Sequence, residues 1–231
     1  MSRTLNVVRM QLVNRQTFIW IPLIILGGCL VISLAIYALL ISSGVHGVKV
    51  GGAAQGPLWY FLAVGIQSLT LTFPFSQAMS VTRREFYLGT LLTAAVASAV
   101  LATIFVLGGL LEQATNGFGL NGYMFYLEWI WQAGPLAAGL AYFSGAMLLF
   151  VIGFACATIW KRFGAMGLTL VLIAAGAAIL GILWLISRAD AWGGVAAWIM
   201  TQGALGLAAW GLVATALLAG ASYLILRRAI P

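Results

Sequence analysis

The chain has 231 residues, of which 63% are hydrophobic and 6% are charged, and its formal net charge is +7. Soluble domains carry about 25% charged residues, and a fold of this size could not bury so much apolar surface away from water. The basic residues stand singly or in pairs between apolar runs instead of gathering on one face, which excludes a nucleic-acid-binding surface and indicates a membrane protein.

The segment 1–16 predicts an interfacial helix on the inner surface of the membrane. Its apolar residues fall along one helical stripe. Its basic residues lie at the border of that stripe or outside it: Arg3, Arg9 and Arg15. A helix of this kind lies in the membrane interface and contacts anionic lipid. A basic tail with little structure is the alternative.

Six apolar runs follow, and each reaches the roughly 20 residues that a helix needs to cross the hydrocarbon core. They are 18–41, 57–79, 88–111, 135–160, 164–186 and 203–226. The runs are continuous, whereas the strands of a barrel would alternate over about ten residues. The expected fold is therefore an all-α integral membrane protein with six transmembrane helices in a single domain, 1–231.

The distribution of basic residues predicts the orientation of these spans. Six spans place both termini on one side, and the segments on that side hold nine basic residues. The other side holds only Lys49 and Arg188. Because cytoplasmic loops carry an excess of lysine and arginine, both termini are expected in the cytoplasm and the protein in the plasma membrane.

Three segments on the outer side differ in composition. The segment 42–56 is rich in glycine and is expected to be a mobile link. The segment 112–134 holds several aromatic residues around Glu128 and predicts a short helix on or in the outer leaflet. The segment 188–202 predicts a re-entrant or interfacial piece before the last span.

The second span is the most polar of the six. Pro74 removes one backbone hydrogen bond and predicts a bend in this helix. The polar side chains are expected either to hydrogen-bond to neighbouring helices or to line a partly wet transport pathway. Those that would line such a pathway are Gln67, Thr70, Ser76 and Gln77.

Small residues recur every four positions on three of the spans. They are Ala94, Ser98 and Ala102 in the third, Ala174 and Ala178 in the fifth, and Ala216 and Gly220 in the sixth. Lipid supplies no hydrophobic drive between helices, so faces of this kind permit the close approach on which packing depends. We expect packing within the chain, with contact to a second copy as the alternative.

The segment 80–87 joins the second and third spans and is the strongest candidate for a binding site. Thr82 and Glu85 have capping-box spacing, in which the hydroxyl accepts from the Glu85 amide and the carboxylate reaches the Thr82 amide. A short helix is expected to begin here. Its first turn would present arginines and aromatic anchors to the cytosol: Arg83, Arg84, Phe86 and Tyr87. Topology signalling and contact with lipid headgroups are the alternative roles.

The interfacial helix, six spans with both ends inside and Thr-Arg-Arg-Glu-Phe-Tyr-Leu-Gly-Thr at 82–90 together resemble the permease subunits of ABC-2 type ABC transporters, especially actinobacterial members. The resemblance implies a dimer of six-helix subunits, here expected as a homodimer. It also implies that the segment 80–87 forms a coupling helix, whose residues 82–87 dock into a groove of a separate ATPase subunit, present in two copies.

The same resemblance implies that 188–202 is a re-entrant helical pair and that the first and fifth spans meet across the dimer. The aromatic loop 112–134 departs from the family pattern, because it is longer than a minimal member needs.

The chain has no G-x-x-x-x-G-K-[ST] phosphate loop, so ATP and magnesium are expected on the partner ATPase and no cofactor or metal on this chain. No catalytic residue is expected, because His46 is the only histidine and the four carboxylates are scattered. The expected function is ATP-driven export of an apolar, lipid-like, peptide or drug-like substrate by alternating access. The alternative is the substrate-capturing membrane module of a vitamin importer, which would need convergent polar groups in an outer pocket.

Overall fold

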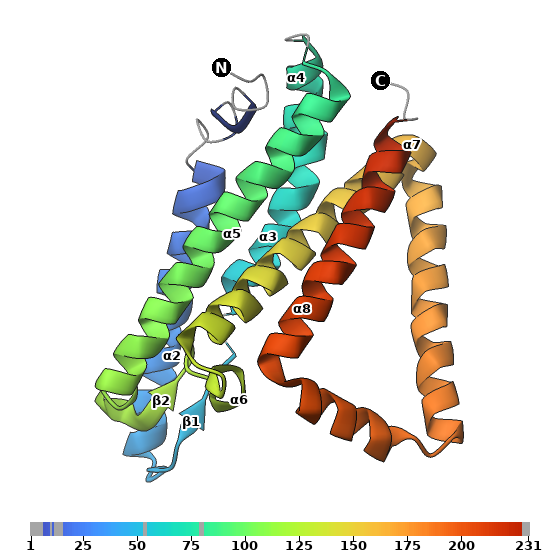
Figure 1. The fold of residues 1–231 in the computed structure, drawn as a ribbon. Coiled ribbons are helices and arrows are strands. Elements are labelled where there is room, and N and C mark those ends of the chain that lie inside the picture. Colours follow the sequence, from blue (N-terminus) through green and yellow to red (C-terminus); the bar gives the residue numbers. More distant parts are fainter. Residues whose placement is uncertain (1–6, 10, 12–15, 53–54, 79–80, 228–231) are drawn as a thin grey trace.

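Long helices run between two ends of the molecule in the computed structural model (Figure 1). The structure describes residues 7–9, 11, 16–52, 55–78 and 81–227. The elements, in chain order, are a π-helical turn (Gln16–Trp20), α2 (Ile21–Ser42), β1 (Lys49–Val50), α3 (Gln55–Gln67), a π-helical turn (Ser68–Thr72), α4 (Phe73–Ala78), α5 (Arg83–Ala114), a π-helical turn (Gly117–Asn121), β2 (Gly122–Tyr123), α6 (Glu128–Trp131), α7 (Pro135–Arg188) and α8 (Trp192–Arg227).

The helices begin at local sequence signals. Pro22 lies in the first turn of α2, and Pro135 is the first residue of α7, where a proline loses no intrahelical hydrogen bond. Thr82 caps α5.

In the second apolar run, Pro74 has no N–H to donate to the carbonyl of Thr70. Thr70 lies in the π-helical turn before α4. The helix therefore departs from regular α-helical hydrogen bonding in the turn before Pro74.

Among the described residues, five helical stretches are long and apolar enough to cross a membrane. They are Gln16–Ser42, Gln55–Gln77, Arg83–Ala114, Pro135–Arg188 and Trp192–Arg227. The predicted helical, membrane-compatible character is confirmed.

The 54-residue α7 is broken at Gly164, where φ is 73° and ψ is −175°, a conformation that residues with a Cβ avoid. The break lies where the sequence separates its fourth and fifth runs, and Figure 1 shows the two limbs of α7 at a sharp angle.

The segments that carry basic pairs lie at one end of the molecule. Figure 1 shows the start of α5, the bend of α7 and the end of α8 at the end that also holds α4. The strands β1 and β2 and the short α6 lie at the opposite end. This grouping agrees with the predicted division of the connecting segments into two sides.

α3 and the first limb of α7 cross at close range. A Cβ on Gly65 would lie 2.1 Å from the carbonyl oxygen of Phe150, and a Cβ on Gly153 would lie 2.0 Å from that of Leu62. Glycine therefore brings the two backbones together, as expected where helices associate without a hydrophobic drive. Among the described residues, the phenylalanines that are at most 1% exposed are Phe86, Phe105, Phe150 and Phe154.

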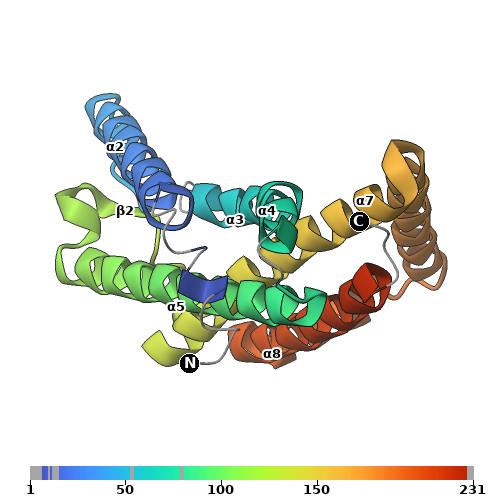
Figure 2. The same ribbon diagram turned by 90° about the horizontal axis from the view of Figure 1, so that it is seen from above.

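The second limb of α7, residues 165–188, lies at the edge of the molecule in both views (Figures 1 and 2). Nearly all of its side chains are exposed, including Ala174 and Ala178, and so are Ala216 and Gly220 of α8. Packing within the chain is confirmed for the small residues of the third span, which are buried in α5. The same prediction is wrong for the small residues of the fifth and sixth spans, because no described helix of this chain covers them.

α8 is also broken by a glycine. At Gly203, φ is 60° and ψ is −174°, and residues 192–202 form a short helix that lies across the end of the molecule (Figure 1). A separate piece before the last long helix was predicted for 188–202, and the structure contains one. Most of its side chains are exposed.

Candidate functional site

The α4–α5 corner, residues 81–87, contains the predicted capping box. The Thr82 hydroxyl oxygen accepts from the Glu85 amide at 3.3 Å, and the Thr82 amide donates to the Glu85 carboxylate at 3.0 Å. Thr82 has extended backbone angles, φ −69° and ψ 150°, as an N-cap residue should. The capping box is confirmed, and the corner has a defined conformation.

The predicted coupling helix is not a separate element among the described residues. α5 continues from Arg83 to Ala114, so the corner is its N-cap and first turn. Because the first turn and the rest of α5 form one continuous helix, any displacement of the first turn would also displace the rest of α5.

The expectation that Phe86 and Tyr87 face the cytosol is wrong. Phe86 is 0% exposed and packs edge-on against Phe73, with the ring centroids 5.2 Å apart. Tyr87 is 5% exposed, and its hydroxyl donates to the carbonyl of Ala219 in α8 at 2.6 Å. The physical reason is that burying a large ring against a neighbouring helix releases more free energy than leaving it at the surface. Both aromatics therefore fasten α5 to its neighbours.

The two arginines of the corner have different surroundings. Arg83 Nη1 donates to the carbonyls of Leu226 and Arg227, at 3.3 and 3.4 Å, at the C-terminal end of α8. These carbonyls have no intrahelical partner, and the negative end of the helix dipole favours a cation beside them. Arg84 is exposed. Of the residues 82–87 that were predicted to contact a partner, Thr82 and Arg84 are exposed, and Arg84 is the exposed cation.

The bend of α7 contributes to the same end of α8. Arg162 Nη1 lies 3.5 Å from the carbonyl oxygen of Ile225, and Lys161 Nζ lies 4.8 Å from the centre of the Phe73 ring. Arginines from α5 and α7 thus converge on the last carbonyls of α8. The basic pairs of α5 and α7, which were predicted as topology signals, therefore also link α5 and α7 to the end of α8.

The described part of the N-terminal segment lies against α5. Arg9 is exposed, whereas Val7 and Gln11 are each 1% exposed. Gln11 Nε2 donates to Thr90 Oγ1 at 2.7 Å. Arg3 and Arg15, the other basic residues of the predicted interfacial helix, lie outside the described residues.

The polar residues of the second span are mostly satisfied by nearby backbone carbonyls. Thr70 donates to Ile66 at 3.0 Å, Ser76 to Phe73 at 2.7 Å, and Gln77 to Val81 at 3.0 Å. These bonds favour the hydrogen-bonding explanation, with partners close in the chain instead of on neighbouring helices. Gln67 lines a small pocket of about 80 Å³ beside the N-terminal segment. Ser76 is buried, whereas Gln67, Thr70 and Gln77 are half-buried.

A buried carboxylate organises the opposite end of the molecule. Glu112 is 0% exposed and accepts hydrogen bonds from the amides of Met124, Phe125 and Tyr126, at 2.9, 2.9 and 2.7 Å. Three backbone donors replace the water that a carboxylate would otherwise need. We call residues 45–52 and 115–134 the outer cap. Sequence reasoning missed this role, although a lone acid at the end of an apolar run was the available signal.

The outer cap includes a short parallel ladder between β1 and β2. Lys49 pairs with Gly122, and Lys49 Nζ donates to the carbonyl of Leu120 at 3.2 Å. The expectation that 42–56 forms a mobile link is therefore wrong for β1, which is fixed to the loop after α5. The short helix predicted within 112–134 is present as the single turn α6.

A crevice of about 360 Å³ opens beside the outer cap, between α3, α6, α7 and α8. Trp59 and Trp129 contribute to its walls, and Gln55 and Ser144 supply polar atoms. The Ser144 hydroxyl already donates to the carbonyl of Ala208 at 2.9 Å. Apolar contacts therefore dominate this crevice.

No protein-family model, no curated protein and no solved structure matches this chain. Its function is therefore inferred from the geometry of the corner, the exposed helices and the outer cap.

Proposed function

We propose that the chain is the transmembrane permease subunit of an ATP-driven exporter of the ABC-2 type. The α4–α5 corner carries this proposal. Its first turn is capped, its exposed cation is Arg84, and Arg83 and Tyr87 fasten it to α8. A partner that pulls or pushes on Arg84 would therefore move α5 and α8 together.

The proposed topology has six spans with both termini in the cytoplasm. It divides α7 at Gly164 into a fourth and a fifth span, each long enough to cross the hydrocarbon core. The excess of basic residues at the end that holds the α4–α5 corner supports a cytoplasmic position for that end. The corner would then face a cytosolic ATPase.

A second copy of the chain would complete the transmembrane unit. The exposed second limb of α7 and the exposed small residues of α8, Ala216 and Gly220, support this proposal. Small residues allow helices of two copies to approach closely, and a two-fold axis would use the same face on each copy. A homodimer is the simplest such assembly.

ATP and magnesium would bind to two copies of a separate ATPase subunit. Closure of these subunits would move both corners and shift the dimer between inward-open and outward-open packings. The apolar walls of the pockets between the helices support an apolar, lipid-like, peptide or drug-like substrate.

The crevice beside the outer cap favours a second function, the substrate-capturing module of a vitamin importer. Its volume of about 360 Å³ falls within the range of small-molecule pockets. Specific capture also needs several convergent polar groups. Gln55, Tyr142 and Ser144 are among the polar residues on its walls, and the hydroxyls of Tyr142 and Ser144 are already engaged with backbone carbonyls.

The two functions differ in what the solubilised chain would bind. Affinity purification from membranes, followed by mass determination of the intact complex, tests the first. We expect two permease chains with two ATPase chains that carry a phosphate loop. Recovery of a single chain with no ATPase would overturn the exporter proposal, and nanomolar binding of a vitamin by that single chain would establish the alternative.

A further inference from the structure

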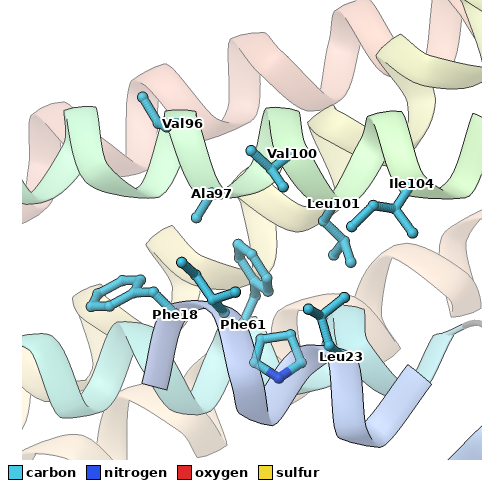
Figure 3. A pocket seen from close by; sticks show the side chains of 10 residues that line it. Phe18, Leu23, Phe61, Val96, Ala97, Val100, Leu101 and Ile104 are labelled. Atoms are coloured by element: carbon cyan, nitrogen blue, oxygen red, sulfur yellow. The ribbon is translucent and has the colours of Figure 1, made fainter. Parts of the chain in front are cut away.

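An apolar groove runs between α2 and α5 and is closed at its base by α3. Its volume is about 280 Å³. Figure 3 shows Phe18 and Leu23 on one wall facing Ala97, Val100 and Leu101 on the other, with Phe61 of α3 between them. All these side chains are hydrocarbon. A groove of this kind within the spanning helices can hold a chain of methylene groups.

A small polar pocket of about 80 Å³ adjoins the groove, because Phe18 contributes to the walls of both. Gln11, Gln67 and Ser68 are among the residues that line this pocket. The two neighbouring pockets therefore offer a polar part beside an apolar part, which is the pattern of an amphiphile.

The polar part contains a side-chain atom without a partner. Gln11 is 1% exposed, and its Nε2 is engaged with Thr90 Oγ1, but its Oε1 accepts no hydrogen bond from any described residue. A buried acceptor left unpaired is costly, so native structures nearly always satisfy it. A ligand that donates a hydrogen bond at this point would remove the cost.

We propose that this site binds one membrane lipid of the phosphatidylethanolamine type. One acyl chain lies in the groove between α2 and α5, and the headgroup ammonium donates to Gln11 Oε1. The bilayer is as apolar as the groove, so the acyl chain alone gives little preference for the site. Selectivity comes from the headgroup, and phosphatidylcholine has no N–H or O–H donor to offer. The inference does not depend on the transport proposal.

Photo-crosslinking of the full chain in phosphatidylcholine vesicles tests the site. Two probes are compared at trace level, a phosphatidylethanolamine and a phosphatidylcholine with the same diazirine-bearing acyl chain. We expect labelled peptides to cover residues 18–23 and 96–104, with about fivefold more label from the ethanolamine probe, the factor of one net hydrogen bond. Equal labelling by the two probes, or label spread evenly over lipid-facing helices, would overturn the proposal.

Four variants separate the two parts of the site. Ala97→Trp fills the groove and should lower labelling by both probes to the background measured on residues 165–188. Leu92→Trp is the matched control, because Leu92 is an exposed residue of α5 outside the groove walls, and it should keep the label. Gln11→Leu should make the two probes equal. Thr90→Val removes the same hydrogen bond to Gln11 but keeps Oε1, so the ethanolamine preference should persist.

Monodisperse elution of each variant confirms that it is folded before labelling. Persistent label in Ala97→Trp, or a persistent ethanolamine preference in Gln11→Leu, would contradict the assignment of the corresponding part of the site.

Discussion

Arg83 and Arg84 are neighbours in the chain, yet Arg83 Nη1 lies 3.3 Å from the carbonyl oxygen of Leu226, whereas Arg84 is exposed. One arginine stabilises the contact between α5 and α8, and the other is available to a partner. Substitutions at the two positions should therefore have different effects, one on the stability of the subunit and one on its association.

Arg84→Glu should weaken association with the ATPase subunit by about thirtyfold, the effect of losing an arginine hot spot of roughly 2 kcal/mol. The free energy of unfolding of the permease should hardly change, because the side chain is exposed. Titration of purified ATPase onto the reconstituted permease measures the dissociation constant. Arg188→Glu, at the opposite end of the molecule, is the matched charge control. An unchanged dissociation constant for Arg84→Glu would remove the corner from the coupling interface.

Arg83→Ala should lower the free energy of unfolding by about 1 kcal/mol, because two carbonyls at the end of α8 lose their donor. Arg162→Ala should act on the same helix end through Ile225. Since both arginines serve one helix terminus, the double variant should depart from additivity by about 0.5 kcal/mol or more. Thermal unfolding of the two single variants and the double variant in detergent measures the coupling. Strict additivity would mean that the two contacts are independent.

Tyr87→Phe should retain ATPase binding but reduce ATP-driven transport. The substitution keeps the buried ring and removes only the hydrogen bond to the Ala219 carbonyl, which costs about 1 kcal/mol. Motion of α5 would then be transmitted less completely to α8. The measurement is the ratio of substrate moved to ATP hydrolysed in proteoliposomes. Tyr223→Phe, on the adjacent ring of α8, is the matched control. An unchanged ratio in Tyr87→Phe would show that this bond does not transmit the motion.

The long helices could be predicted because each apolar run must satisfy its own backbone in lipid. The capping box could be predicted too, since Thr82 and Glu85 interact across three residues and need no other part of the fold. The break at Gly164 falls between two runs that basic residues already separated. Local interactions and chain length are sufficient for these features.

The surroundings of individual side chains could not be predicted in the same way. The burial of Phe86 and Tyr87 depends on which face of α5 meets α4 and α8, and amphipathy gives no such signal when both lipid and core are apolar. The three amides bound to Glu112 come from a loop more than ten residues away. The unpaired oxygen of Gln11 likewise depends on contacts far along the chain.

Glu112→Gln should loosen the outer cap. An amide has one acceptor oxygen, so part of the three-amide arrangement loses its acceptor while a new N–H₂ group is buried. The expected loss is about 2 kcal/mol in the free energy of unfolding. Limited proteolysis within 115–134 should also become faster. Glu128→Gln, an exposed acid in the same cap, should leave both quantities unchanged. Equal behaviour of the two variants would exclude Glu112 as the organiser of the cap.

Gly65→Ala should disrupt the crossing of α3 and α7 most severely. The added Cβ would lie 2.1 Å from the carbonyl oxygen of Phe150, which is backbone and cannot move aside as a flexible side chain could. The helices must separate, at a cost of about 3 kcal/mol, the upper part of the range for overpacked cores. Gly153→Ala should behave similarly, since its Cβ would meet the carbonyl of Leu62 at 2.0 Å. Gly176→Ala is the matched control in the exposed limb, where a Cβ meets nothing within 4 Å. Thermal unfolding of the three variants decides the matter: if Gly65→Ala unfolded at the same temperature as Gly176→Ala, α3 and α7 could not cross as closely as the structure places them.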